Sequence, residues 1–148
     1  MKVISRSLAE TRKAAKEFIT TATGGRRRDS ALVVALLGDL GAGKTAFVQQ
    51  LAFELGVVES VTSPTFVIEK VYALPGGASF SRLIHIDAYR LTTKEELLHL
   101  GWDEISKDPG NIICIEWPSN VSGILQAGAV IIDCAFVDET THTYSYEI

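Results

Sequence analysis

The segment Gly38–Thr45 restricts the fold of this chain more than any other, because its sequence GDLGAGKT satisfies the pattern G-x-x-x-x-G-K-[ST]. Glycines at this spacing let backbone N–H groups turn inward around phosphates. The lysine reaches the β- and γ-phosphates, and the Ser/Thr hydroxyl binds magnesium. The predicted phosphate-binding loop therefore consists of Gly38, Asp39, Leu40, Gly41, Ala42, Gly43, Lys44 and Thr45.

The segments on either side of this loop have the character that a P-loop requires. Residues 31–37 form a continuous apolar run, which is typical of a strand covered on both faces. Residues 44–55 repeat apolar side chains at helical spacing, and Gly56 follows as a stop signal. The order strand, glycine-rich turn, helix is the P-loop arrangement.

The rest of the chain alternates predicted strands and helices, which indicates an α/β fold. The sequence predicts further strands at residues 2–5, 66–74, 82–86, 111–115, 129–137 and 142–148, and helices after Ser7 to about residue 21, at 94–100 and at 102–105. Residues 66–74 and 82–86 flank Pro75-Gly76-Gly77 and predict an antiparallel hairpin. We therefore expect a P-loop NTPase-like three-layer sandwich with a mixed, mostly parallel sheet.

Composition excludes several other classes of protein. The length of 148 residues predicts one domain, residues 1–148. The composition, with 47% hydrophobic and 22% charged residues, is that of a globular protein and excludes a disordered chain. The formal net charge of −4 argues against a nucleic-acid-binding surface, so the cluster Arg26–Arg28 is interpreted as a solvated loop. Cys114 and Cys134 lie in apolar runs and are expected to be buried, reduced thiols. Without a signal peptide or an apolar run of about 20 residues, a cytoplasmic protein is expected, with no membrane contact.

Two carboxylates are predicted to complete the site. Asp87 follows the apolar strand 82–86 and Glu116 follows the strand 111–115. Ligands of open α/β sheets gather at the carboxyl ends of strands, so either acid could hold magnesium or orient the attacking water. Thr65, in the loop Thr62–Thr65, is a candidate sensor of the γ-phosphate. A guanine-reading Asn-Lys-x-Asp is absent, which favours ATP over GTP.

Four motifs in this order resemble the TsaE family, bacterial ATPases required for threonylcarbamoyladenosine formation on tRNA. They are GDLGAGKT (38–45), TSPTF (62–66), HIDAYRL (85–91) and EWP (116–118). The resemblance implies an Mg-dependent ATPase with ATP and Mg²⁺ as cofactors, weak alone and dependent on its partners TsaD and TsaB. It implies tRNA contact only through that complex, and we expect a monomer alone.

The resemblance also assigns roles to residues. It implies catalytic roles for Lys44, Asp87, Glu116 and Thr65, phosphate or nucleotide contacts for residues 38–46 and Ser7, and metal binding by Thr45, Glu116 and Asp87. Trp117 is expected beside the nucleotide, a partner or the core, Arg90 at a partner or phosphate, and His85 and Tyr89 in structural roles. Ala46 stands where the family often has threonine, which puts part of the α-phosphate contact in doubt. The simpler interpretation of Ser7 is a helix cap.

Two other functions remain open from the residues. The first is a binding module whose assembly is gated by nucleotide, with hydrolysis incidental. The second is a small P-loop kinase, although no lid insertion or acceptor domain is visible in the sequence.

Overall fold

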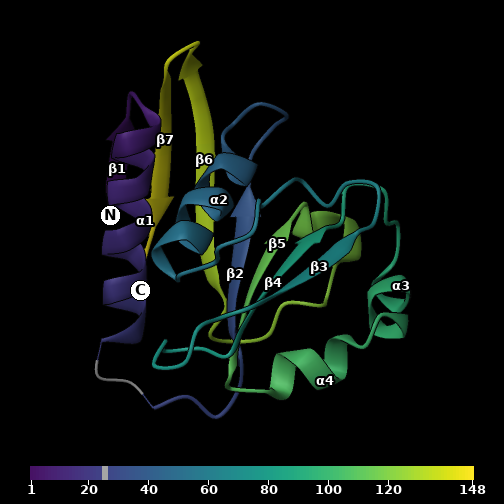
Figure 1. The fold of residues 1–148 in the computed structure, drawn as a ribbon. Coiled ribbons are helices and arrows are strands. Elements are labelled where there is room, and N and C mark those ends of the chain that lie inside the picture. Colours follow the sequence, from purple (N-terminus) through teal and green to yellow (C-terminus); the bar gives the residue numbers. More distant parts are fainter. Residues whose placement is uncertain (25–26) are drawn as a thin grey trace.

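A seven-stranded sheet organises the protein in the computed structural model, which describes residues 1–24 and 27–148 (Figure 1). The strands lie in the order β1-β7-β6-β2-β5-β4-β3. Their bounds are β1 Lys2–Ser5, β2 Leu32–Leu37, β3 Glu69–Ala73, β4 Arg82–Asp87, β5 Asn111–Glu116, β6 Val130–Asp138 and β7 Thr141–Tyr146. The mixed sheet and the α/β class are as predicted.

Parallel pairing is confined to the centre of the sheet. Strand β2 pairs in parallel with β5 and β6, and β5 pairs in parallel with β4. The outer pairs β1–β7, β6–β7 and β3–β4 are antiparallel. Three of the six pairings between described strands are therefore parallel. The prediction that the sheet is mostly parallel is wrong, because the other three pairings are antiparallel. The hairpin β6–β7 and the returning strand β1 extend the sheet with antiparallel neighbours.

Helices cover both faces of the sheet and make three layers (Figure 1). Helices α1 (Leu8–Thr23) and α2 (Lys44–Glu54) pack on one face, where Leu32, Val34 and Leu36 of β2 point. Helices α3 (Lys94–His99) and α4 (Trp102–Lys107) and the short 3₁₀ helix η1 (Pro118–Val121) cover the other face, where Val33 and Ala35 point. This alternation follows from the two-residue period of a strand and explains why the run 31–37 is continuously apolar.

The predicted elements are present, and the largest displacement of a boundary is at the start of β3. Strand β3 begins at Glu69, three residues later than the predicted start at residue 66. The backbone N–H of Ile68 donates to the carbonyl of Pro64 at 2.6 Å, and Ile68 has φ of 69°. A left-handed β-branched residue cannot continue a strand, so the chain turns before it enters the sheet.

Ser7 is the N-cap of α1, in agreement with its interpretation as a helix cap. Its hydroxyl accepts a hydrogen bond from the Glu10 backbone N–H at 3.1 Å, while Glu10 Oε2 accepts from the Arg6 N–H at 2.6 Å. We expect Ser7→Ala to lower the free energy of unfolding by about 1 kcal/mol and Ser7→Asp to preserve it. Urea unfolding measures this difference. An unchanged ATP affinity in Ser7→Ala would assign Ser7 to the helix alone, whereas a large loss would restore the nucleotide-contact interpretation.

Three smaller expectations concern composition. Cys114 and Cys134 are free and buried, as predicted, and burial raises the pKa of Cys134 to about 12. Of the basic cluster, Arg26 lies outside the described residues, as does the neighbouring Gly25. Arg27 is exposed, and Arg28 Nη2 donates to the carbonyl of Ala22 at 2.7 Å. None of the described helices combines the length and the apolar composition of a membrane span.

Candidate nucleotide-binding site

The P-loop connects β2 to α2 through a backbone that leaves no room for a Cβ atom at two of its glycines. Gly38 has φ of 141°, and a Cβ there would lie 2.3 Å from the carbonyl oxygen of Cys134. Gly43 has φ of 98°, and a Cβ there would lie 2.6 Å from the hydroxyl of Tyr144. Burial raises the pKa of Tyr144 to about 12, so its hydroxyl stays protonated and donates to the Gly43 carbonyl at 3.1 Å. The loop therefore packs against Cys134 of β6 and Tyr144 of β7.

Gly38→Ala should lower the free energy of unfolding by about 2–3 kcal/mol, because the methyl group would collide with backbone and favour a different φ. Gly76→Ala is the matched control, since Gly76 lies in a turn with nothing within 4 Å of a new Cβ. Denaturant unfolding of the two variants measures the difference. Equal stabilities would show that the loop does not adopt this backbone conformation.

The side chain of Lys44 folds back over the beginning of the P-loop. Its side chain is nearly buried, at 5% residue exposure, and its ammonium group donates to the Gly38 carbonyl and to the Asp39 carbonyl at 3.0 Å. The indole of Trp117 covers it, with Nζ 4.1 Å from the ring centroid. The ammonium group is thus placed at the position where phosphate oxygens would replace these two carbonyls as its acceptors.

Glu116 is the carboxylate that reaches the predicted magnesium ligand Thr45. Strands β2 and β5 are direct neighbours, so the end of β5 lies beside the P-loop. The Thr45 hydroxyl lies 3.1 Å from Glu116 Oε1 and 3.2 Å from Oε2. A hydroxyl and a carboxylate are hard oxygen donors of the kind magnesium prefers. The donor set of Thr45 and Glu116 therefore fits the cation that a P-loop site requires.

Asp87 lies one strand further along the same sheet edge. Asp87 and Glu116 are register partners on β4 and β5, so the two acids predicted from separate strand ends are adjacent. Asp87 Oδ2 accepts from the Thr65 hydroxyl at 2.8 Å, and Oδ1 accepts from the Tyr89 backbone N–H at 3.0 Å. Asp87 therefore contacts Thr65 of the loop Thr62–Thr65, while Glu116 contacts Thr45.

His85 is a site residue whose contact the sequence analysis missed. It is fully buried, and its Nε2 lies 2.6 Å from Glu116 Oε2. His85 and Asp87 are two residues apart on β4 and therefore share one face of the sheet. The two-residue spacing of His85 and Asp87 could have indicated that the two side chains lie on the same face of the sheet, near the end of β4.

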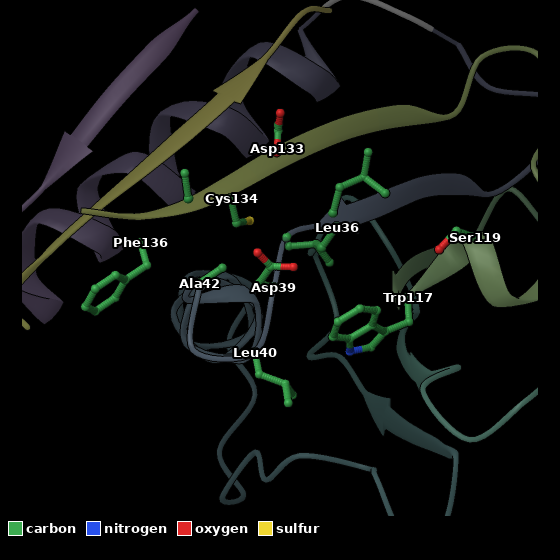
Figure 2. A pocket seen from close by; sticks show the side chains of 12 residues that line it. Leu36, Asp39, Leu40, Ala42, Trp117, Ser119, Asp133, Cys134 and Phe136 are labelled. Carbon is green, nitrogen blue, oxygen red and sulfur yellow. The ribbon is translucent and has the colours of Figure 1, made fainter. Parts of the chain in front are cut away.

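A cavity of about 620 Å³ lies beside the P-loop (Figure 2). Its lining comes from β2, the loop, the segment after β5, and β6: Leu36, Leu37, Gly38, Asp39, Leu40, Ala42, Trp117, Ser119, Asp133, Cys134, Ala135 and Phe136. Trp117 and Phe136 lie on opposite sides of the loop (Figure 2). The contribution of β6 was not predicted, because the C-terminal hairpin has no recognisable motif and is placed here by pairing with β2.

The remaining candidate residues lie around this centre. Trp117 has φ of 58° and packs against Tyr89, with ring centroids 5.1 Å apart. Arg90 is exposed, and its guanidinium carbon lies 5.8 Å from the ring centroid of Phe66. Ala46 lies on α2 directly after Thr45. Tyr89, for which a structural role is expected, is half exposed and lies beside Trp117.

The buried parallel strand, the glycine-rich loop, the helix and the adjacent acids define a P-loop NTPase-like protein. A solved structure, that of Bacillus subtilus YdiB, is similar over 99% of this chain and 83% of its own, with a TM-score of 0.73 and 27% sequence identity. The family model described as threonylcarbamoyl adenosine biosynthesis protein TsaE matches residues 5–144, and the chain belongs to the TsaE family. This is a family of tRNA threonylcarbamoyladenosine biosynthesis.

Curated relatives of this chain carry the name tRNA threonylcarbamoyladenosine biosynthesis protein TsaE. The relative from Treponema pallidum is 39% identical over 108 residues, which is 73% of this chain and 76% of the relative. The relative from Borreliella burgdorferi is 43% identical over 86 residues, which is 58% of this chain and 59% of that protein. The resemblance based on the four motifs is thereby confirmed.

Proposed function

We propose that residues 1–148 form one P-loop ATPase domain that hydrolyses Mg-ATP in the formation of tRNA threonylcarbamoyladenosine. The observation that carries this proposal is the contact of the Glu116 carboxylate with the hydroxyl of Thr45, which directly follows Lys44 in the P-loop. These three residues are the ones that a P-loop site needs for the metal and the β- and γ-phosphates.

Each residue has a role that follows from its position. The backbone N–H groups of the loop and the positive end of α2 bind phosphate oxygens. Lys44 would exchange its two carbonyl acceptors for oxygens of the β- and γ-phosphates. Thr45 and Glu116 would hold magnesium, which would neutralise charge on the phosphates. Asp87, held by Thr65, orients the water that attacks the γ-phosphate. We assign no transferase chemistry to this chain.

The proposed partners are TsaD and TsaB, with tRNA contacted only through them. Exposed apolar side chains lie around the nucleotide site: Phe66 is 84% exposed and follows Thr65, and Leu40 at the tip of the P-loop is 71% exposed. Exposed apolar groups at the rim of a site are suited to contact with another protein. The net charge of −4 gives no support to direct tRNA binding. We place this activity in the cytoplasm, where tRNA is modified, and expect a monomer in the absence of partners.

ATP turnover with and without TsaD and TsaB tests the proposal, with threonylcarbamoyladenosine formation as a second readout. We expect slow Mg²⁺-dependent release of phosphate by the protein alone and a changed rate when both partners and tRNA are present. A protein that neither binds ATP nor supports modification would contradict the proposal.

A nucleotide-gated binding module is the second candidate function. The hydrogen bonds of Lys44 to its own loop and of Thr65 to Asp87 would both change when phosphates enter, so occupancy alone could alter the surface around Phe66. The two candidates differ in whether hydrolysis is needed, and the Glu116 variant described in the Discussion separates them.

A further inference from the structure

A buried polar pair joins β4 to β5 behind the P-loop. His85 is 0% exposed and Glu116 is 3% exposed, and His85 Nε2 lies 2.6 Å from Glu116 Oε2. The register partner of His85 is Cys114, so the imidazole reaches diagonally to the residue two positions further along β5. The contact therefore depends on the pairing of these two strands, which fixes both backbones.

The surroundings of His85 define which ring nitrogen carries the proton. Nδ1 is buried and has no hydrogen-bond partner among the described residues. A carboxylate oxygen only accepts, so Nε2 must donate to Glu116. The arrangement is an imidazole that donates from Nε2 to the Glu116 carboxylate.

This hydrogen bond constrains a flexible side chain. A glutamate has several rotatable bonds and loses rotamer freedom when it is held in one orientation. Glu116 is held at Oε2 by the imidazole of His85, while the Thr45 hydroxyl lies 3.1 Å from Oε1. Partners of this kind orient ligands before a metal binds, and their loss typically weakens metal binding.

We propose that His85 is a positioning residue, which holds the Glu116 carboxylate against Thr45 so that the magnesium ligands are oriented before nucleotide arrives. The inference rests on the proposed ATPase function and adds to it a residue that does not touch the nucleotide. A residue that only filled the core would be replaceable by an apolar side chain of similar size. A positioning residue is replaceable only by another donor at the same place.

Two variants separate these roles. His85→Leu fills the space without a donor, and the amide nitrogen of His85→Gln reproduces a donor near the position of Nε2. His99→Leu, at an exposed position on α3, is the control. The measurements are the affinity for Mn²⁺ in the presence of ADP, followed by EPR of free Mn²⁺, and the affinity for ADP in EDTA.

We expect His85→Leu to weaken Mn²⁺ binding about 10- to 100-fold, with metal-free ADP affinity nearly unchanged, and His85→Gln to restore most of the loss. Wild-type Mn²⁺ affinity in His85→Leu, or an equal loss of ADP affinity in EDTA, would overturn the role of His85. A wild-type protein that binds no ADP would instead contradict the proposed function and the role with it.

A measurement on the unsubstituted protein keeps the inference testable even if His85→Leu does not fold. ¹⁵N NMR of the histidine side chains identifies which ring nitrogen carries the proton. The inference requires a proton on Nε2 of His85, together with near-normal Mn²⁺ binding by His85→Gln. A proton on Nδ1 alone, or weak Mn²⁺ binding by a folded His85→Gln protein, would overturn it.

Discussion

Lys44→Ala should bind Mg-ATP about 1,000-fold more weakly than the unsubstituted protein. Its ammonium group donates two hydrogen bonds to loop carbonyls, and the proposal assigns these donors to phosphate oxygens. Hydrogen bonds to charged groups contribute about 1.5–3 kcal/mol each, so the loss of two corresponds to about 4 kcal/mol. Isothermal titration calorimetry with a non-hydrolysable ATP analogue measures this change.

Lys13→Ala is the matched control for this prediction. Lys13 is exposed on α1, so its removal changes the net charge equally without touching the loop. We expect the control to bind the analogue with unchanged affinity. Equal affinities in Lys44→Ala and Lys13→Ala would show that the loop is not the phosphate site.

Glu116→Gln should bind ATP but hydrolyse it about 100- to 1,000-fold more slowly, as expected when one pre-oriented electrostatic contact to the reaction is lost. The amide keeps the shape of the side chain and an acceptor for His85, but it removes the charge beside Thr45. Phosphate release under saturating ATP measures the rate, and a binding titration shows that the site is still occupied.

The same variant decides between an ATPase and a nucleotide-gated module. If Glu116→Gln binds ATP, cannot hydrolyse it and yet supports repeated threonylcarbamoyladenosine formation, hydrolysis is incidental and the gated module is correct. The ATPase proposal requires modification to stop with hydrolysis. Glu139→Gln, at an exposed turn position, is the control and should change neither readout.

The local parts of the site were predictable from sequence because they depend on short-range geometry. The motif 38–45 specifies its own strand–loop–helix context, and carboxyl ends of strands meet at one edge of a sheet. The sequence therefore predicted that Asp87 and Glu116 would come near the loop. Which acid faces Thr45 depends on the strand order, in which β5 and not β4 is the neighbour of β2.

The parts that were missed depend on long-range pairing or on unusual backbone conformations. Phe136 reaches the cavity because β6 pairs with β2, and no local pattern in the C-terminal hairpin specifies that partner. The sequence predicted that β3 begins at residue 66, three residues too early. Ile68 adopts a left-handed conformation, which β-branched residues rarely adopt and which the sequence pattern does not indicate. The contact of His85 with Glu116 needed both the strand order and the register of β4 on β5.

A crystal structure of the protein grown with Mg²⁺ and a non-hydrolysable ATP analogue tests the central claim most directly. The account predicts the triphosphate inside the curve of residues 38–45, with the Lys44 ammonium moved from the Gly38 carbonyl to phosphate oxygens and the metal beside Thr45 and Glu116. Nucleotide bound elsewhere, or a loop that stays closed on Lys44 at saturating analogue, would contradict it.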